Sequence, residues 1–359
     1  MALRAVFLPN HRVSMTYQIT VETANAQFPA EADESILAAA ARAGLVFPYN
    51  CRNGVCGTCM AQCVSGAFVY PSEEADGERP RGISEAAHAQ GQVLLCQAQA
   101  RSDLTLIAQP VDAVADFDIR TLPARVESLT RLAHDVMRVR LRLGGGRAVD
   151  YLPGQYLEVL LKDGRTRAFS MATPPDPEGL LELHIRHVPG GVFSTEVFET
   201  MAPKQILRVR LPLGTFFLRE DQPRPALLVA GGTGFAPLQA VMTDALARNL
   251  GRPLHLFWGV RDRPDLYLAA VPQAWAAEQA AVQFTPVLSE PSPDSGWQGE
   301  TGFVHQAVLR AYPDLSRFDA YLCGPPPMID AARDAFIAAG LPADRLFFDA
   351  FDYAAEAEG

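Results

Sequence analysis

The stretch from Ala226 to Leu238 reads ALLVAGGTGFAPL, and it decides the fold class of the C-terminal part of the chain. Its first five residues form a continuous apolar run, which predicts a buried strand, and the glycine-rich turn after them leads into a predicted helix over 238–249. A second buried strand is expected over 254–260. Because strands alternate with helices here, we predict an α/β domain with a doubly wound parallel sheet over residues 223–352.

The segment before this stretch has the pattern of an antiparallel sheet. Arginines alternate with Val139, Leu141 and Leu143, which is typical of a half-buried strand. Further short strands are expected at residues 155–161, 165–172 and 181–188. Short strands at this spacing predict an antiparallel β-barrel domain over residues 118–222, followed by a linker at 221–225.

Cysteine spacing defines the N-terminal part of the chain. Cys51, Cys56 and Cys59 follow the pattern C-x4-C-x2-C, and Cys96 stands further along the chain. This is the plant-type spacing for a [2Fe-2S] cluster held by four thiolates. The alternative is a zinc site, which usually pairs two C-x2-C steps, whereas only one such step is present. Cys63 falls outside the ligand spacing and is interpreted as a packed thiol, with ligand exchange as the alternative.

Composition excludes several classes of function. The chain has 359 residues and a net charge of -10, so we expect no binding to nucleic acid or to an anionic membrane. The longest weakly charged stretch, 36–47, is shorter than the roughly 20 residues that a membrane span requires. Residues 1–14 lack the features of a secretory signal and are interpreted as a loose extension, so we expect a cytoplasmic protein.

The cysteine spacing and the glycine turn, together with further motifs in the same order along the chain, carry a resemblance to a known family. From residue 15 to 352 the chain resembles the NAD(P)H-dependent iron-sulfur flavoprotein reductases, which join a plant-type ferredoxin domain to a ferredoxin-NADP-reductase-like module. Within that family it is similar to CDP-6-deoxy-glucoseen reductases and to reductase components of bacterial aromatic-ring oxygenases. The resemblance implies a β-grasp ferredoxin domain over 15–112, and FAD as the cofactor of the barrel.

The first pair of motifs concerns the flavin. Arg167-Ala168-Phe169-Ser170 matches the family's R-x-[YF]-S motif, which implies that Arg167 binds the flavin pyrophosphate, Phe169 contacts the isoalloxazine, and Ser170 places a hydroxyl near flavin N5. The run from His184 to Ser194 resembles the second flavin segment. The residues of that segment expected to contribute are His184, Arg186, Gly191 and Ser194.

The remaining motifs concern the nicotinamide cofactor. The glycine turn, the aromatic-Gly-x-Arg strand end and the run CGPPPM beginning at Cys323 all match the family. The resemblance implies that Cys323 lies beside the nicotinamide and flavin rings, as a catalytic residue together with Ser170, and that Phe351 stacks on the flavin. Glu290 stands where NADP-using relatives carry an arginine, so NADH is favoured over NADPH. The cofactor-binding residues expected in the nicotinamide-binding part of the chain are Gly232, Thr233, Gly234, Arg261, Glu290, Cys323, Gly324 and Phe351.

Together these features predict an NADH-dependent reductase that passes electrons through FAD and the [2Fe-2S] cluster to a protein acceptor. The acceptor is expected to be the terminal oxygenase of an aromatic-compound oxygenase system, with a deoxysugar dehydrase as the alternative. A third hypothesis, from another class, is a non-enzymatic zinc-binding or redox-sensing module. Residues 15–110 carry ten acidic residues and five arginines, which predicts docking of a basic partner surface at the ferredoxin domain.

Overall fold

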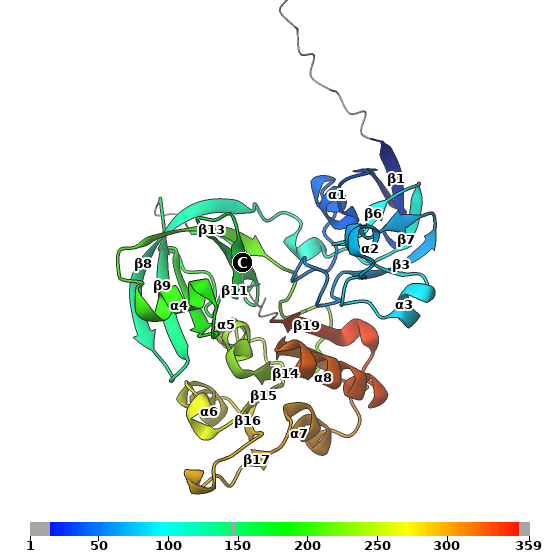
Figure 1. The fold of residues 1–359 in the computed structure, drawn as a ribbon. Helices are drawn as coiled ribbons and strands as arrows, with labels where there is room; N and C mark the ends of the chain where they lie inside the picture. Colours follow the sequence, from blue (N-terminus) through cyan, green and yellow to red (C-terminus); the bar gives the residue numbers. More distant parts are fainter. Residues whose placement is uncertain (1–14, 146–147, 352–359) are drawn as a thin grey trace, which may run out of the picture. The chain divides into compact units, whose positions relative to one another are not determined.

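The chain forms two compact units, residues 1–115 and residues 116–359, in a computed structural model that describes residues 15–145 and 148–351. The predicted extension at 1–14 and the end of the chain after Phe351 lie outside the described residues. Figure 1 shows the elements of both units. The positions of the two predicted boundaries between the three domains, near 112 and 222, stay a prediction.

The first unit is an α+β domain built on a five-stranded mixed sheet. Its strands run in the order β2-β1-β7-β3-β5, with β1 and β7 parallel and the other neighbours antiparallel. The elements of this unit are β1 (Thr16–Val21), β2 (Ala26–Glu31), α1 (Ile36–Arg42), β3 (Met60–Ser65), β4 (Phe68–Val69), α2 (Pro71–Asp76), α3 (Glu85–Ala89), β5 (Gln92–Leu94), β6 (Gln99–Ala100) and β7 (Leu104–Ile107). Helix α1 begins after Ser35, whose hydroxyl accepts the N–H of Ala38 as an N-cap.

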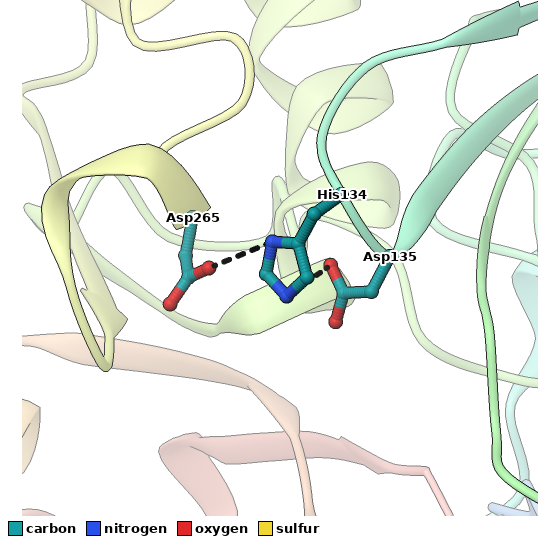
Figure 2. A group of neighbouring side chains, drawn as sticks. All are labelled: His134, Asp135 and Asp265. Atoms are coloured by element: carbon teal, nitrogen blue, oxygen red, sulfur yellow. Dashed lines mark ion pairs between the residues drawn. The ribbon is translucent and has the colours of Figure 1, made fainter.

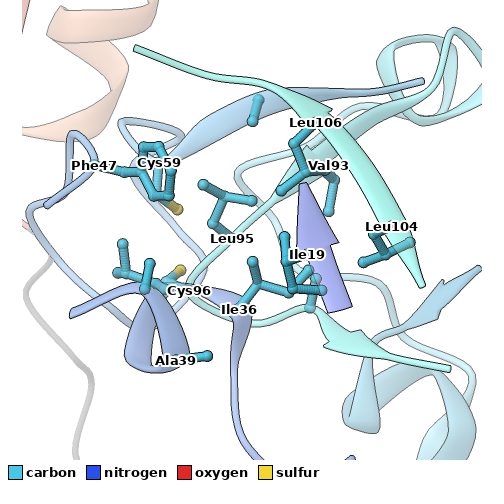
Figure 3. Close-up of a cluster of buried hydrophobic side chains, with 14 of the residues drawn as sticks. Ile19, Ile36, Ala39, Phe47, Cys59, Val93, Leu95, Cys96, Leu104 and Leu106 are labelled. Carbon is cyan, nitrogen blue, oxygen red and sulfur yellow. The ribbon is translucent and has the colours of Figure 1, made fainter. Parts of the chain in front are cut away.

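The core of this unit includes two of the four predicted ligand cysteines. Cys59 and Cys96 are buried in one cluster with apolar side chains from the sheet and from α1, such as Ile19, Ile36 and Leu95 (Figure 3). A well-packed core resists displacement of any member. Packing of this core therefore fixes the positions of the two cysteines.

The second unit begins with an antiparallel β-barrel. Its strand order is β11-β10-β13-β8-β9-β12, and the two end strands are joined where Ala172 N–H donates to the Glu182 carbonyl at 2.8 Å. The elements are β8 (Arg120–Arg131), β9 (Val136–Leu143), β10 (Tyr156–Leu160), β11 (Thr166–Ser170), β12 (Leu180–Arg186), α4 (Val192–Glu199) and β13 (Ile206–Leu213). On β9 the apolar residues point into the barrel core and the arginines alternate with them, as the sequence pattern predicts.

The second unit ends with a parallel sheet in the order β17-β16-β15-β14-β18-β19. Helices α5 and α6 cover one face, and α7 and α8, which pack against each other, cover the other (Figure 1). The elements are β14 (Ala226–Gly231), α5 (Phe235–Ala247), β15 (Leu254–Val260), α6 (Ala270–Glu278), β16 (Val282–Leu288), β17 (Glu300–Thr301), α7 (Val304–Ala311), β18 (Asp319–Gly324), α8 (Pro326–Ala338) and β19 (Leu346–Ala350). The predicted fold class is confirmed in all three parts.

All strands of this sheet are parallel, and the order in which the chain adds them reverses between β14 and β18. Strands added after β14 extend the sheet through β15 and β16, whereas β18 and β19 lie on its other side. Ligands of open α/β sheets bind at the carboxyl ends of the strands where this reversal occurs. The turns after β14 and β18 are therefore the expected ligand site, and both carry predicted residues.

Three local features differ from the sequence-based expectations. Helix α5 begins at Phe235 rather than Leu238, because residues 232–234 form a 3-10 turn that continues directly into it. Helix α8 begins at Pro326, since proline is tolerated in the first helical turn, where its missing N–H would have no partner. Helix α2 lies in a stretch expected to be a surface loop, and it too starts with a proline.

No helix in residues 15–145 and 148–351 combines the length and the apolar character that crossing a bilayer would require.

Candidate functional site

The loop between α1 and β3 holds three of the predicted ligands. Backbone N–H groups surround the first of them: Cys56 N donates to Cys51 Sγ at 3.3 Å. A hydrogen bond from the Cys56 thiol, with those from the N–H groups of Cys56, Asn53 and Val55, lowers the pKa of Cys51 to about 6. This loop therefore stabilises negative charge on sulfur, which is what a thiolate ligand to iron requires.

The strongest interactions among the four cysteines lie within two pairs. Cys51 is hydrogen-bonded to Cys56, and Cys59 to Cys96; the Cys59 thiol lowers the pKa of Cys96. In the described part of the chain, the one set of three His, Cys, Asp or Glu side chains whose ligand atoms lie within 4.8 Å of one another contains no cysteine. A single zinc ion would draw all four sulfurs to about 2.3 Å from one point. Two pairs of thiols, one for each iron, suit the [2Fe-2S] cluster that the cysteine spacing predicts.

Special backbone conformations let the loop approach the sulfurs closely. Gly54 and Gly57 have φ of 81° and 78°, in the left-handed region that favours glycine. A Cβ on Gly54 would also lie 2.8 Å from Gln97 Cγ, next to Cys96 in sequence. Gln97 in turn donates from Nε2 to the Arg52 carbonyl at 2.9 Å. These contacts hold the fourth ligand against the loop that carries the other three.

Cys63 takes no part in either pair. It lies on β3, its Sγ is 3.5 Å from the Ser65 carbonyl oxygen, and burial raises the pKa of its thiol. A thiol in this environment stays protonated at neutral pH. Its geometry agrees with the interpretation as a packed thiol.

The predicted flavin residues of β11 lie near the parallel sheet. Ser170 is buried, and its Oγ is 3.1 Å from Oδ2 of Asp349 on β19. Phe169 contacts the ring of Phe193 at a centroid distance of 5.5 Å, and Arg167 Nη1 donates to the Thr166 carbonyl at 2.9 Å. The serine hydroxyl thus comes from the barrel and the carboxylate from the other sheet, at the boundary between the two.

The second flavin segment forms a close-packed turn at the start of α4. A Cβ on Gly191 would lie 2.6 Å from Ser194 Oγ, so only glycine fits there. Ser194 Oγ accepts the N–H of Val188 at 3.1 Å and lies 3.2 Å from the carbonyl oxygens of Val188 and Gly191. The hydroxyl therefore shapes this turn, and its direct contact with a pyrophosphate stays a prediction.

His184 and Arg186 on β12 both reach the nucleotide-binding part. His184 Nε2 lies 3.1 Å from Glu182 Oε1, and His184 Nδ1 lies 3.1 Å from the hydroxyl of Tyr267. Desolvation lowers the pKa of His184, although the nearby Glu182 carboxylate acts in the opposite direction. The lowered pKa favours the neutral ring. Both ring nitrogens have protein partners, so this side chain joins the barrel to the segment after β15. Arg186 Nε lies 3.0 Å from Asp135 Oδ2.

The turns after β14 and β18, where the strand order reverses, are packed backbone against backbone. A Cβ on Gly234 would lie 2.0 Å from the Cys323 carbonyl oxygen, and one on Gly324 would lie 3.1 Å from the Gly231 backbone. A Cβ on Gly232 would lie 2.7 Å from Arg186 Nη1. These contacts fix the backbone of both turns as a cradle at the start of α5, where N–H groups of a helix start can bind a phosphate, and Thr233 of this turn is buried.

Cys323 and Asp349 are neighbours in the register of β18 and β19. Cys323 is fully buried, and burial together with the Asp349 carboxylate raises the pKa of its thiol well above the usual range. The thiol is therefore neutral, and its catalytic place beside the nicotinamide and flavin rings stays a prediction. Ser170 and Asp349 can hold a proton between them in a site shielded from water.

Asp349 was not among the residues predicted from the sequence. It is separated from Ser170 by 179 positions, and no motif of the sequence marks it. The one available signal was a carboxylate on an otherwise apolar terminal strand, LFFDA. Phe351, which follows it, donates its N–H to the Gly324 carbonyl at 2.9 Å. This contact keeps the predicted stacking residue beside the Cys323 turn.

Arg261 and Glu290 mark the outer end of the candidate nucleotide site. They follow the adjacent strands β15 and β16, and Glu290 N–H donates to the Arg261 carbonyl at 2.8 Å. Both side chains are exposed. The structure thus brings these two predicted residues together at one edge of the sheet.

Two buried polar atoms support a ligand at the boundary between the barrel and α5. In the described residues, Thr173 Oγ1 and Gln239 Oε1 have no hydrogen-bond partner, although Gln239 Nε2 donates to the Ala172 carbonyl at 3.1 Å. Buried polar atoms without partners are rare in native proteins and commonly mark ligand contacts. Thr173 follows the R-x-F-S strand, where the flavin is expected, and Gln239 reaches the same segment from α5 through its bond to Ala172.

A further group of polar side chains links the barrel to the nucleotide-binding part. Figure 2 shows His134 and Asp135, between β8 and β9, facing Asp265. His134 Nδ1 lies 3.6 Å from Asp265 Oδ1, and His134 Nε2 lies 3.9 Å from Asp135 Oδ1. Because Asp135 also pairs with Arg186, and Asp265 Oδ2 accepts the Asp262 N–H, these carboxylates are already used in protein contacts. Sequence reasoning missed this group.

Comparison with known proteins accounts for all three parts of the chain. Residues 19–101 match the model of the 2Fe-2S iron-sulfur cluster binding domain, residues 123–218 the oxidoreductase FAD-binding domain, and residues 228–334 the oxidoreductase NAD-binding domain. A dehydrase reductase of Yersinia pestis, CDP-6-deoxy-L-threo-D-glycero-4-hexulose-3-dehydrase reductase, is 35% identical over 94% of this chain and 99% of its own length. The chain belongs to the iron-sulfur flavoprotein reductases.

Other relatives of this reductase serve different systems. The phenol hydroxylase P5 protein of Acinetobacter pittii is 35% identical over 89% of each chain. The crystal structure of the Amycolatopsis cytochrome P450 reductase GcoB is similar with a TM-score of 0.75 and 32% identity, covering 95% of this reductase and all of that chain. The predicted enzyme class and the cofactors FAD, NAD and 2Fe-2S are confirmed, and the non-enzymatic hypothesis is wrong.

The residues of the reductase fit these cofactors. Two pairs of thiols suit a two-iron cluster, the glycine cradle suits a dinucleotide, and orphaned polar atoms lie where the flavin is expected. When bound, FAD supplies a carrier that accepts a hydride and releases electrons singly, which NAD alone cannot do. Roles of individual side chains stay predictions.

Proposed function

We propose that this reductase oxidises NADH and delivers the electrons from its cluster to a partner protein that docks at the ferredoxin unit. The observation that carries the proposal is the presence of both ends of such a relay in one chain. Two thiol pairs that suit a one-electron carrier occur together with a backbone cradle that suits a dinucleotide. A chain with only one of these would need a second protein to split an electron pair.

The proposed acceptor is the oxygenase component of an aromatic-compound oxygenase system. Phenol hydroxylase and terephthalate dioxygenase relatives, at 35% and 33% identity, are named as parts of such systems. A deoxysugar dehydrase is the second candidate, because the Yersinia relative named for it is 35% identical over nearly the whole chain. Genes beside the one for this reductase distinguish the two: an oxygenase gene supports the first, and sugar-nucleotide genes contradict it.

NADH is the proposed electron donor because of the charge at Glu290. Its exposed carboxylate lies at the outer edge of the candidate nucleotide site, where it can accept a hydrogen bond from a ribose hydroxyl. The same carboxylate would repel the 2'-phosphate of NADPH. Arg261 lies beside it and offsets part of this repulsion, so we expect preference rather than exclusion.

Anaerobic titration of the purified holoprotein tests the proposal. NADH is expected to bleach both the flavin and the iron-sulfur absorption, with kcat/KM about fivefold higher than for NADPH, since repulsion by one exposed charge costs on the order of 1 kcal/mol. A colourless preparation, or a preference for NADPH, would contradict the proposal. Dithionite, which needs no nucleotide site, is the control that both cofactors are reducible.

The proposed docking surface is the acidic segment 73–85. Its Gly82 backs directly onto the cysteine loop: Gly82 N–H donates to the Gly54 carbonyl at 2.7 Å, and a Cβ on Gly82 would meet three atoms of that loop. The carboxylates of Asp76, Glu78 and Glu85 are exposed on this segment. A basic partner attracted to these charges would approach the cluster closely, as electron transfer requires.

A charge-neutral variant tests this surface. Glu78→Gln is expected to slow NADH-driven reduction of cytochrome c, a basic protein, by about twofold to threefold at low salt, because a rim charge mainly affects the association rate. The effect should vanish at high salt. Glu22→Gln, which removes an equally exposed charge from the end of β1, is the matched control. Equal slowing by both variants would show a general field effect and no local docking surface.

A further inference from the structure

The carbonyl of Gly232 is held by two donors. The indole Nε1 of Trp258, on β15, donates to it at 2.9 Å, and the N–H of Phe235 donates to it from the start of α5. Gly232 has φ of 55°, in the left-handed region, and a residue without a Cβ restricts the orientation of the following peptide less than any other. The two hydrogen bonds together fix the orientation of the Gly232 carbonyl.

Fixing this carbonyl also fixes an N–H group of the turn. The peptide bond is planar and trans, so the Gly232 carbonyl and the Thr233 N–H point in opposite directions. Since the carbonyl points at the Trp258 indole, the Thr233 N–H points away from that indole. Backbone N–H groups at the start of a helix are the donors that bind phosphate groups.

The indole itself cannot turn away. Trp258 is fully buried and stacks on Phe235 with ring centroids 4.1 Å apart and planes 13° from parallel. Tyr267 packs its ring against Trp258 edge to face at 5.1 Å, and the Tyr267 hydroxyl is held by His184. Rotation of the indole would disrupt all of these contacts, so its N–H is a preorganised donor.

We propose that Trp258 is a positioning residue for dinucleotide binding, which orients the Gly232–Thr233 peptide so that its N–H faces the bound nucleotide. The inference rests on the proposed dinucleotide site and adds a residue outside the glycine motif to it. Tryptophan is needed because, among the large apolar side chains, it alone carries a fixed N–H donor. Phenylalanine would keep most of the packing and would leave the carbonyl with one donor.

Calorimetry of the holoprotein with tetrahydro-NADH, which has no hydride to transfer, tests the role without relying on turnover. Trp258→Phe is expected to raise the Kd for this analogue and the KM for NADH by about fivefold, the contribution of one neutral hydrogen bond. Turnover at saturating NADH, and the visible spectrum, should stay unchanged. Replacing Trp258 with benzothienylalanine, which keeps the ring shape but lacks the N–H, provides a second variant if the phenylalanine variant does not fold.

Trp275→Phe is the matched control. Its ring also faces Phe235, at 6.5 Å, so it reports the effect of trimming the same aromatic cluster. Unchanged affinity in both Trp258 variants, or an equal loss in Trp275→Phe, would overturn the inference. Wild-type protein that fails to bind the analogue at all would instead refute the proposed function, which separates the two failures.

Discussion

Replacing Cys56 with serine is expected to abolish NADH-driven reduction of cytochrome c while NADH-driven reduction of ferricyanide is retained. Cys56 forms one of the two thiol pairs, and a serine hydroxyl, with its much higher pKa, is a poor ligand for iron. We expect a loss of more than about 100-fold with cytochrome c, since the cluster is the proposed route to one-electron acceptors. Ferricyanide can take electrons directly from the flavin, so its rate should fall less than about threefold.

Cys63→Ser is the control for the cysteine loop. Cys63 lies in the same unit but outside both thiol pairs, so its variant should keep the cluster absorption and both activities. Equal loss of the cytochrome c and ferricyanide activities in Cys56→Ser would contradict the order of electron transfer. Loss of the cluster in Cys63→Ser would contradict the assignment of ligands.

Gly234→Ala is expected to remove NADH binding. The added Cβ would lie 2.0 Å from the Cys323 carbonyl oxygen and 3.0 Å from the Gly324 nitrogen, and both are backbone atoms that cannot move without disturbing β18. Overpacking of this kind costs roughly 3 kcal/mol, which corresponds to a rise of about 100-fold in the KM for NADH. Steady-state kinetics with NADH and a titration with dithionite measure the effect.

The glycine control separates a local clash from general destabilisation. Gly251, in the loop before β15, has φ of 64°, and a Cβ there would meet no atom within 4 Å. Gly251→Ala should lower the free energy of unfolding by about 1 kcal/mol and leave the KM for NADH unchanged. An unchanged KM in Gly234→Ala, with the fold and the flavin retained, would show that the two turns do not form the nucleotide site.

Much of the fold could be predicted because its signals are local. The apolar run before the glycine turn, the alternation on β9 and the order of strands and helices each occur within a few neighbouring residues. Helix boundaries were predicted less accurately. Helix α5 starts three residues before its predicted start at 238, because a 3-10 turn leads directly into it. Helix α2 was missed because its short sequence is as polar as a loop. Hydrophobic periodicity reveals neither a helix of six residues nor a 3-10 turn that continues into a helix.

The candidate site was predicted less completely than the fold. Every predicted nucleotide residue of the two turns lies in the backbone cradle, and the four ligand cysteines form pairs. Asp349, Tyr267 and Asp265 were missed, although they contact Ser170, His184 and His134. Each of these contacts joins the barrel to the nucleotide-binding part, and a single sequence does not show which distant residues meet.

Spacing along the chain was sufficient for the [2Fe-2S] cluster and for the barrel and parallel-sheet classes, because cysteine ligands, alternating strands and glycine turns keep their distances in sequence. The β-grasp fold and the FAD cofactor came from the resemblance to the family. The pairing of thiols, the opposition of Ser170 and Asp349, and the hydrogen bond from Trp258 to Gly232 were decided only by the tertiary structure. Such contacts depend on strand register and on packing between strands that are adjacent in space and far apart in sequence.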